Sequence, residues 1–546
     1  MTRLALIAGL VCVASAAAQP APDPSYAHDG VALVESPVSM RVRGVDAITS
    51  PDGSTTMAVQ STTMDWRDPG SSLARLTPDG SPDAAFGPAG LREVLLPAGM
   101  DALYIERLTG LPDGRMAAAG EVKVFNGPVQ YDYYAVVILF HPDGRPDTTF
   151  SDDGFAVLPR TVGEALSHAY AISYVGGGLV VAGTVFTSGS GPDGFVSRFT
   201  LEGKLDTTFG TSGTTLVTGP DHDQFYDLAA FPDGRLLAVG YNTRQATQQD
   251  DALFVRLDAA GRIETTNGVI KRDLFGGSRD RAVRATLLPD GRALVAGTTR
   301  RRIGSVESDG TTLFVFRRDG SPETDFGSEG WTWTDAIPSP YNNANWEFTN
   351  EWPGRPFAHG GGFAVPVGQP TSVYEGEGGG LALSFQHQDG QPDASAGPGG
   401  VVRLFAGYNL SLVATAPPVD GRLVAAGWHT SMYYPQNQKP AAVRVRLTGA
   451  TPTAEAAVPE GAVALAIVPN PVAASARVTL ALDAPATVSV RVVDALGRTV
   501  AVLADGSIGA GPHTFGVDAG ALAPGVYAVV AMVGHERSVT RMTVVR

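Results

Sequence analysis

The chain has 546 residues, of which 43% are hydrophobic and only 17% charged, and it contains 66 glycines and 39 prolines. There is enough apolar material for a large core and too little charge for a disordered chain, and the glycine and proline content is typical of many short strands joined by turns. The net charge of −15 and the lack of any lysine or arginine run argue against binding to nucleic acid.

The first segment is typical of a secretory signal peptide. Arg3 precedes an apolar run, Leu4 to Ala18, which is shorter than the roughly 20 apolar residues that a membrane-spanning helix needs. Small residues at its end predict cleavage after Ala18, so residues 1–18 form the signal peptide. The one cysteine, Cys12, lies inside this segment and follows a poor lipobox. The mature chain is therefore expected to have no disulfide and no transmembrane segment.

Two short phrases recur along the chain. The first is Asp-Gly-Arg followed by an apolar run and a glycine, with six residues between its two glycines. An Asp-Gly pair before a strand predicts a hairpin turn, because glycine adopts the positive φ that such turns require. Clear copies begin at Asp113, Asp233, Asp290 and Asp420, weaker copies at Gly177 and Gly362, and a degraded copy at Asp52.

The second phrase is a glycine with a carboxylate three residues later, a phenylalanine six residues later and often another glycine ten residues later. Its carboxylates are Asp83, Asp147, Asp206, Glu264, Glu323 and Asp393, and its phenylalanines are Phe86, Phe150, Phe209 and Phe326. We expect the carboxylates to accept hydrogen bonds from backbone N–H groups of the turn and the phenylalanines to fill the gap between neighbouring blades. Calcium binding by the carboxylates is the alternative, but their recurrence favours an architectural role.

The constant spacing predicts one structural unit of about 60 residues. Counted from Gly30, residues 30–449 contain seven such units, each with four strand-like runs that are rich in β-branched and aromatic residues. In the third unit these runs are 155–159, 170–174, 179–182 and 194–199. Four strands repeated seven times predict an all-β fold, a seven-bladed β-propeller with four-stranded blades, because an open β-solenoid usually has shorter repeats.

The phrases Gly-Lys-Leu-Asp-Thr-Thr-Phe-Gly at 203–210 and Phe-Pro-Asp-Gly-Arg-Leu-Leu-Ala-Val-Gly at 231–240 resemble the bacterial delta-60 repeat. The resemblance covers roughly 30–449 and is strongest in the second to fifth units. It implies a propeller-like extracellular or surface domain and no defined reaction.

The composition changes near residue 449. Residues 450–462 are rich in Ala, Pro and Glu and read as a linker, and 463–546 carry six or seven short alternating strands. Such a pattern predicts a small immunoglobulin-like β-sandwich. Three motifs stand out in this region: Pro469-Asn470-Pro471, Asp494 with Gly497-Arg498, and Pro524-Gly525-Val526-Tyr527.

In this order and at the extreme C-terminus, these motifs resemble the type A C-terminal sorting domain of the type IX secretion system. The resemblance implies that the type IX secretion machinery is a partner and that the chain crosses the outer membrane. Such domains are then usually removed, and the product is anchored to surface lipopolysaccharide or released. Family members often end in a Lys-rich stretch, whereas this chain offers only Arg537, Arg541 and Arg546. An ordinary accessory adhesion sandwich is the alternative.

The chain carries no catalytic signature. It has no nucleophile elbow, no His-Glu-x-x-His and no phosphate-binding glycine loop, and its nine histidines show no ligand spacing. We therefore expect no cofactor and no metal. The most charged loop, Asp221-His222-Asp223, reads as a solvated turn.

The tryptophans break the symmetry of the repeat. Five of six lie between Trp331 and Trp428, and the sixth unit carries an extra segment at about 337–359. Extra residues in a repeat often lie on the binding face, where exposed rings contact sugars or proteins. The alternative is that these rings pack the segment onto its own blade. The candidate ligand-binding residues are Trp331, Trp333, Tyr341, Trp346, Trp352 and Trp428.

Together these features favour a secreted or outer cell-surface protein whose propeller binds a polysaccharide or a surface protein without catalysis. The alternative is a secreted polysaccharide hydrolase or lyase. It requires two carboxylates, or a histidine and a carboxylate, at one opening of the propeller, with at least one shifted pKa. The two functions are distinguished by the charged residues that do not repeat and by whether they cluster at one end of the central channel.

Overall fold

The computed structural model divides into two compact units, Met1–Pro452 and Thr453–Arg546. It describes the chain except residues 1–19, 36–40, 63–69, 128–129, 160–165, 188–190, 267, 304–305, 335–352, 370–379, 406–409, 431–437, 448–464, 469–471, 473–474, 483–485, 494–498, 510, 523–524, 534–535 and 545–546. The predicted signal peptide (1–18) and linker (450–462) therefore lie outside the described residues. The described elements are β-strands and short 3-10 turns, which confirms the predicted all-β class.

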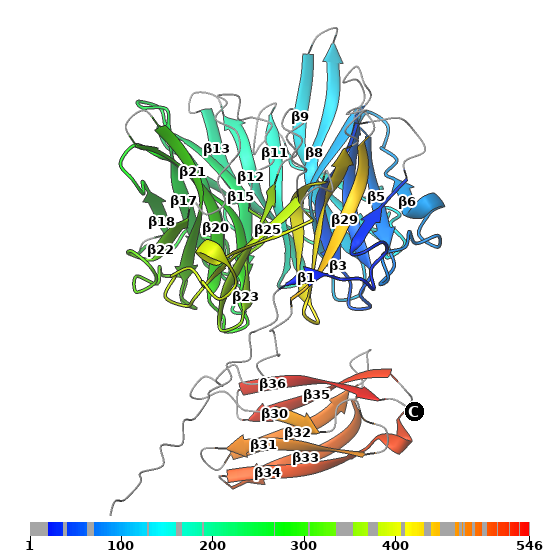
Figure 1. The fold of residues 1–546 in the computed structure, drawn as a ribbon. Helices are drawn as coiled ribbons and strands as arrows, with labels where there is room; N and C mark the ends of the chain where they lie inside the picture. The colour runs from blue at the N-terminus through cyan, green and yellow to red at the C-terminus, as the bar shows by residue number, and fades with distance from the viewer. Residues whose placement is uncertain are drawn as a thin grey trace, which may run out of the picture. The chain divides into compact units, whose positions relative to one another are not determined.

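In the first unit the described strands form seven antiparallel sheets (Figure 1). Three of them hold the first strands of the repeat, each with four strands in chain order. Sheet 1 contains β3 (Arg41–Thr49), β4 (Thr55–Thr62), β5 (Gly70–Leu76) and β6 (Leu91–Glu93), sheet 2 contains β7 (Ala102–Gly110), β8 (Met116–Gly127), β9 (Gln130–Phe140) and β10 (Phe155–Val157), and sheet 3 contains β11 (Ser167–Val175), β12 (Gly178–Thr187), β13 (Gly191–Phe199) and β14 (Thr214–Val217).

Three further sheets repeat this order, and a closing sheet completes the unit. Sheet 4 contains β15 (His222–Ala230), β16 (Leu236–Arg244), β17 (Gln249–Leu257) and β18 (Val269–Arg272), sheet 5 contains β19 (Arg279–Leu287), β20 (Ala293–Ile303), β21 (Val306–Phe316) and β22 (Trp331–Thr334), and sheet 6 contains β23 (Phe357–His359), β24 (Gly362–Gln369), β25 (Gly380–Gln386) and β26 (Val401–Leu404). The turns η1 (Pro88–Gly90) and η3 (Pro398–Gly400) precede β6 and β26.

The sheets pack face to face around a common axis. Separate hydrophobic clusters join each sheet to the next, and a last cluster joins the closing sheet to sheet 1. The first strands of most successive sheets contact one another and so line the central channel, whereas the short fourth strands lie outermost. This radial packing is a β-propeller, as the repeat predicts.

The Asp-Gly-Arg phrase forms the turn between the first two strands of a sheet. In sheet 2, Leu111 N donates to Arg115 O at 2.8 Å, and Gly114 has a φ of +87°. The sequence unit and the sheet are nevertheless offset by one strand. The run that begins at Phe155 opens the third sequence unit, but it pairs with β9 of the preceding sheet, opposite Ile138. The reason is that the second phrase joins the third and fourth strands of one sheet, so the strand after it is the outer strand of that same sheet.

The carboxylates of the second phrase stabilise their turns, as predicted. Asp147 accepts hydrogen bonds from the backbone N and the hydroxyl of Thr149, at 3.0 and 2.6 Å. The same carboxylate pairs with Arg115 of the first phrase at 3.0 Å. Arg292 and Glu323 repeat this pair in sheet 5 at 3.2 Å. The two phrases of a sheet are therefore joined by an ion pair, which explains why both recur.

The phenylalanines of the second phrase lie between neighbouring sheets, as predicted. Phe150 is fully buried among residues of sheets 2 and 3. Phe209 lies in the same way between sheets 3 and 4 and under the turn glycine Gly261, where a Cβ atom would lie 2.5 Å from its ring. Gly261 also has a φ of +77°. Both the backbone conformation and the ring of the neighbouring sheet therefore require glycine there.

The closing sheet combines the two ends of the unit. It contains β27 (Leu410–Val419), β28 (Arg422–Thr430) and β29 (Gln438–Arg446), and β29 also pairs with β1 (Ala21–Pro22) and β2 (Val31–Leu33) from the N-terminal end. The pairs include Ala21 with Arg446 and Val31 with Val443. The N-terminal segment thus supplies the outer strands of the last sheet and closes the propeller.

Residues Asp23 to Gly30 are a further copy of the second phrase. Asp23 N donates to Arg444 O at 2.9 Å, the bond that Asp83 N makes to Arg75 O in sheet 1. Tyr26 stands in the phenylalanine position, fully buried, and a Cβ atom on the next turn glycine, Gly80, would lie 2.9 Å from its ring. The copy is separated from the rest of its repeat by the whole propeller, and the repeat count from Gly30 begins at its end.

The second unit has two sheets around one core. One sheet has the order β30 (Leu465–Val468), β31 (Ser475–Leu482), β34 (Gly511–Asp518), and the other β33 (Thr499–Ile508), β32 (Ala486–Val493), β35 (Gly525–Val533), β36 (Glu536–Val544). The turn η4 (Ala519–Ala521) follows β34. Buried side chains of both sheets, such as Val478 and Val490, share one hydrophobic cluster. The unit is a β-sandwich with a core of its own.

Candidate functional site

The strands that line the channel share an irregularity. In five sheets the first strand carries a β-bulge at the equivalent place, at Val45, Glu106, Tyr170, Tyr226 and Val283. A bulge adds one residue to a strand and redirects the side chains beside it, and bulges are common next to functional sites. The bulged residues and their successors differ in chemistry from sheet to sheet, so the repeat symmetry of the molecule is broken at the channel.

A strip of aromatic side chains runs from the β8–β9 hairpin across sheets 2 to 4. The hairpin extends beyond its neighbours (Figure 1) and carries Phe125 and Tyr131, which are 47% and 45% exposed with ring centroids 5.3 Å apart. From Tyr133 the strip continues over His168, Tyr170, Tyr226 and Tyr241, at steps of 6.0, 6.0, 5.6 and 5.5 Å. The aromatic strip is defined as Phe125, Tyr131, Tyr133, His168, Tyr170, Tyr226 and Tyr241.

Charged groups flank this aromatic strip. Lys123 Nζ lies 3.6 Å from the centroid of Tyr131, and Arg281 lies 4.5 Å from that of Tyr241 while it pairs with Asp250 at 2.6 Å. His168 Nδ1 is in contact with the Glu121 carboxylate. The cations lie on the ring faces, where the aromatic quadrupole attracts them.

The phenols of the aromatic strip stay neutral. Burial raises the pKa of Tyr170 well above its ordinary value, and the carboxylates of Glu121 and Glu106 raise it further. Burial also raises the pKa of Tyr226. Tyr241 Oη donates to Gln224 Oε1 at 2.9 Å. The aromatic strip therefore offers ring faces and neutral hydroxyls, which suit stacking and hydrogen bonding better than proton transfer.

Charged residues that do not repeat lie on the same channel-lining strands. Asp46 Oδ2 accepts from Leu108 N at 2.8 Å, and Asp227 Oδ2 accepts in the same way from Ala285 N at 3.1 Å. An arginine precedes each of these amides, and a third arginine reaches Asp227 Oδ1 at 3.4 Å. The channel cluster is defined as Asp46, Arg107, Asp227, Arg284 and Arg355.

The electrostatics of the channel cluster reflect its burial. Burial lowers the pKa of Arg284 to about 9, and the neighbouring Arg107 lowers it further against the opposing effect of Asp227. For Arg355, burial opposes the charge but Asp227 and Asp46 outweigh it, so its pKa lies above the ordinary value. Both carboxylates are buried and hold backbone N–H groups of the next sheet, so they are structural partners and not an exposed acid–base pair.

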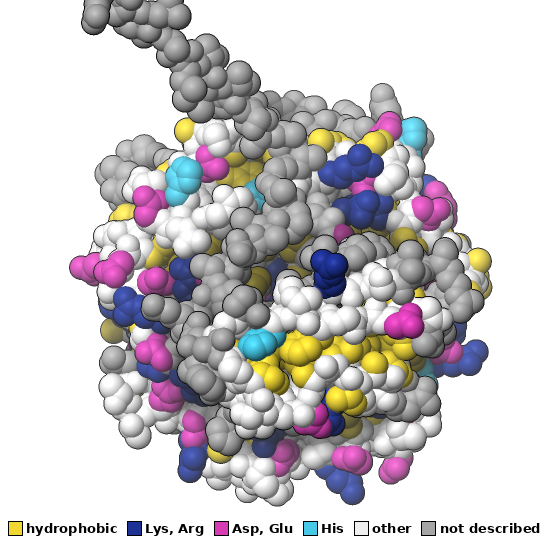
Figure 2. All heavy atoms as spheres, turned by 90° about the horizontal axis from the view of Figure 1, so that it is seen from below, with side chains coloured by type: hydrophobic (Ala, Val, Ile, Leu, Met, Phe, Trp, Pro, Cys, Tyr) yellow, Lys and Arg dark blue, Asp and Glu magenta, His cyan; other side chains and the backbone are white. Residues whose placement is uncertain are grey.

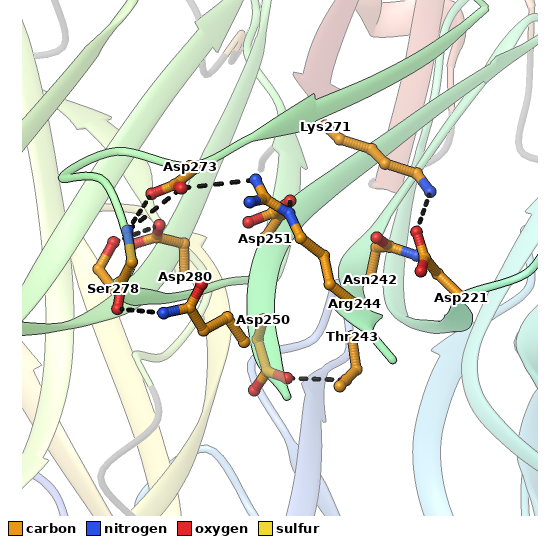
Figure 3. A network of polar contacts seen from close by, with 12 residues as sticks. Asp221, Asn242, Thr243, Arg244, Asp250, Asp251, Lys271, Asp273, Ser278 and Asp280 are labelled. Carbon is orange, nitrogen blue, oxygen red and sulfur yellow. Dashed lines mark hydrogen bonds and ion pairs between the residues drawn. The ribbon is translucent and has the colours of Figure 1, made fainter. Parts of the chain in front are cut away.

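A second polar network joins the outer parts of sheets 4 and 5 (Figure 3). In it Arg244 reaches Asp273 at 3.4 Å and Lys271 reaches Asp221 at 3.7 Å. Burial raises the pKa of Asp280 to about 6, although Leu274 N and the Ser278 hydroxyl donate to it at 2.9 and 2.7 Å. Among the described residues, no group of three or more His, Cys, Asp or Glu side chains has metal-site geometry.

The tryptophans proposed from the sequence do not meet in the structure. Trp331 and Trp333 of β22 are half-buried and pack edge to face on Phe275, at 5.3 and 5.6 Å. Trp428 is buried in β28. The described tryptophans contact no ring of the aromatic strip. Tyr341, Trp346 and Trp352 lie outside the described residues.

The motif residues of the second unit are described only in part. Gly525 begins β35, and Tyr527 of the same strand packs against the core of the sandwich. Strand β35 pairs with β32 on one side and β36 on the other. Pro469, Asn470, Pro471, Asp494, Gly497 and Arg498 lie outside the described residues.

The channel cluster has a signal in the sequence that is easily overlooked. Asp46, Arg107, Asp227 and Arg284 each stand seven residues before the first glycine of a turn phrase, at Gly53, Gly114, Gly234 and Gly291. One repeat position thus carries charges of both signs. The members of the aromatic strip come from β8, β9, β11, β15 and β16 with no common spacing, so only the folded chain brings them together.

Fold and site together define a β-propeller whose unlike residues gather at its channel. The family model described as "Domain of unknown function (DUF5122) beta-propeller" matches residues 68–86 and 177–209. Both segments lie within the first unit and include the second phrase of sheet 1 and of sheet 3. This match supports the β-propeller assignment.

Solved structures resemble the chain only distantly. An unknown function protein from Dyadobacter fermentans is 12% identical with a TM-score of 0.39, over 78% of this chain and all of that chain. Acylaminoacyl peptidase of Pyrococcus horikoshii is 10% identical with a TM-score of 0.37, over 82% of this chain and 59% of that chain. An α-L-arabinanase of Penicillium chrysogenum is 13% identical with a TM-score of 0.35, over 63% and 93%.

No curated protein matches the chain. Within the described part of the chain, no helix has the length and apolar character that a membrane crossing requires. On the face drawn in Figure 2, acidic and basic side chains are interspersed and form no patch of a single sign.

Proposed function

We propose that the protein is an exported, non-enzymatic binding propeller that holds a polysaccharide on the aromatic strip. The observation that carries this proposal is the strip itself: ring follows ring at 5.3 to 6.0 Å from an exposed hairpin to the channel. A linear ligand with apolar ring faces and hydroxyl edges would stack on such a surface and bond to its neutral phenols.

Binding is favoured over hydrolysis by the placement of the carboxylates. Glycoside hydrolysis needs two carboxyl groups that reach the substrate from opposite sides. Asp46 and Asp227 are instead buried and hold backbone amides, and Asp280, whose pKa is raised to about 6, is buried between sheets 4 and 5. The raised pKa of Asp280 follows from burial and is no sign of an acid catalyst.

Within this proposal the seven sheets are seven blades of delta-60 type, and the second unit is an immunoglobulin-like sorting sandwich. The signal peptide would deliver the chain to the periplasm, and the type IX secretion machinery would recognise the sandwich. Support comes from the order of the motifs at the C-terminus and from the separate core of the second unit. The ligand-binding propeller would then act as a secreted or cell-surface protein.

Binding is tested with the mature protein against a panel of purified polysaccharides, by affinity electrophoresis and calorimetry. Replacing Tyr133 by Ala removes a ring in the middle of the aromatic strip. We expect an affinity about tenfold lower, because one stacked ring contributes up to about 1.5 kcal/mol. Tyr174→Ala is the matched control, because Tyr174 lies at the other end of β11 beside the hairpin turn. Equal affinities of the two variants would reject the aromatic strip as the binding site.

Export is tested separately in the native cell. Mass spectrometry of the surface and secreted fractions should find the mature chain without residues 1–18, and deletion of residues 463–546 should leave the propeller in the periplasm. A deletion variant that reaches the surface at the normal level would contradict the sorting role of the second unit.

A further inference from the structure

The channel cluster contains the same local arrangement twice. The carboxylate of Asp46 in sheet 1 holds the amide that follows Arg107 in sheet 2, and the carboxylate of Asp227 in sheet 4 holds the amide that follows Arg284 in sheet 5. Each of these arginines donates one N–H to the carbonyl of its own bulged residue, at 2.7 and 3.0 Å. The two bulges therefore place two guanidinium groups in the channel.

Charge is not balanced within the channel cluster. Three guanidinium groups face two carboxylates, and both carboxylates already accept backbone N–H groups. Arg355 takes the remaining access to Asp227, at 3.4 Å. A buried positive charge without a counter-charge is costly, because the low-dielectric interior does not replace its hydration.

Arg107 shows this imbalance most directly. Its side chain is only 4% exposed, and its Nε–H has no hydrogen-bond partner among the described residues. The carboxylate nearest in sequence is that of Glu106, which accepts from Gln60 Nε2 at 3.4 Å on the side of the aromatic strip. A guanidinium has five N–H donors in a planar fork that matches an oxyanion, so an unused N–H in this position points to an absent acceptor.

We propose that the channel cluster binds one small oxyanion between Arg107 and Arg284. Phosphate, sulfate and the carboxylate of a larger ligand share the chemistry that this pair of forks recognises. The lowered pKa of Arg284 agrees with the proposal, because an added negative charge would relieve the crowding of cations that contributes to it. The site is separate from the ring faces of the aromatic strip and does not depend on polysaccharide binding.

Direct binding to the wild-type mature protein is the first test. Equilibrium dialysis with labelled inorganic phosphate, sulfate and acetate at constant ionic strength should show saturable binding of one anion per chain for at least one of the three. A preference for acetate over both inorganic anions would indicate that the natural ligand carries a carboxylate. No saturable binding of any of the three anions would overturn the proposal.

Variants then locate the anion. Arg107→Met and Arg284→Met should each lower the affinity at least tenfold, whereas Arg145→Met, a surface control whose side chain is 69% exposed, should bind as the wild type does. The thermal midpoint gives a second readout with a definite sign. The bound anion should raise the midpoint of the wild type by several degrees and leave that of Arg107→Met nearly unchanged. An undiminished rise in both Met variants would place the anion elsewhere and refute the site.

Discussion

Asp23 is the residue on which closure of the propeller concentrates. Its side chain is 0% exposed, and its oxygens accept from Arg444 and Arg446 at 2.8 Å and from Arg422 at 3.2 Å. Burial raises its pKa, but hydrogen bonds from Ser25 and the charges of the arginines outweigh burial and hold the pKa well below the ordinary value. The ionised carboxylate is therefore part of the folded state.

Asp23→Asn should destabilise the propeller by about 3–5 kcal/mol at pH 7, because it leaves three arginines around a neutral group. Urea denaturation of the mature protein measures this change. Since the folded pKa is depressed, the contribution is complete above the unfolded pKa of about 4 and disappears only as the pH falls below it. Asp29→Asn in the same exposed turn should change the stability little. A loss below 1 kcal/mol in Asp23→Asn would show that the three pairs contribute little.

The turn glycines allow two causes of destabilisation to be separated. Gly261→Ala combines a φ of +77° with a contact of 2.5 Å to Phe209, whereas Gly276→Ala has a φ of +66° and no atom within 4 Å of the new Cβ. We expect about 1 kcal/mol for backbone strain alone at Gly276 and about 2–4 kcal/mol at Gly261, where the ring must also move. Thermal unfolding of both variants measures the difference. Equal losses would mean that Phe209 adjusts without cost.

Among the elements, the connection between β18 and β19 is held by one carboxylic acid. Asp280 accepts from Leu274 N and Ser278 Oγ, and Asp273 accepts from Gly277 N at 3.0 Å. Phe275 of the same connection packs on Trp331 and Trp333. The ionisation of Asp280 is therefore linked to the covering of these two tryptophans.

Burial raises the pKa of Asp280 to about 6, so between about pH 4 and 6 the folded state binds more protons than the unfolded state. Stability should therefore fall as the pH rises through this range and level off above it. Asp280→Asn should remove this slope and stabilise the protein at pH 7 by about 1–3 kcal/mol. Urea titrations at several pH values check both effects, with the exposed Asp325→Asn as control. A slope that is unchanged in Asp280→Asn would assign it to another group.

The strands of the first unit were largely predictable, since turn glycines and alternating apolar residues depend on local backbone chemistry. Their grouping into sheets was not: the strand at Phe155 follows the second phrase in the sequence but pairs backwards with β9. Local patterns contain no information about which neighbour a short outer strand joins. The aromatic strip was hidden for a related reason, because Tyr133 and Tyr170 approach each other through His168 only after sheets 2 and 3 have packed.

At the scale of the whole molecule, closure depends on a segment at the far end of the unit. Tyr26 is a tyrosine where the other copies have phenylalanine, and its copy lies before the point at which the repeat becomes regular. Its identity as a copy follows from pairing with β29, which no short-range pattern predicts. Position in the sequence and position in the ring thus separate at this one place.

Removal of residues 20–34 should open the propeller. The deletion takes both partner strands from β29 and removes Tyr26 and Val34 from the cluster between the closing sheet and sheet 1. We expect a loss of cooperative unfolding and aggregation of the exposed edge, measured by calorimetry and light scattering. Deletion of 463–546 is the matched control and should leave the thermal midpoint of the propeller unchanged, because the second unit has its own core. A cooperative, monomeric protein lacking 20–34 would contradict this role.

The pairing of Ala21 with Arg446 also sets a timetable for the nascent chain. The segment that is synthesised first must wait for the strand synthesised last, so the ring stays open until nearly all of the first unit has left the ribosome. An open ring is easier to thread through a translocation channel than a closed one. The same geometry brings the two ends of the propeller side by side, so a circular permutant that begins between β2 and β3 should keep the fold with continuous pairing in the last sheet.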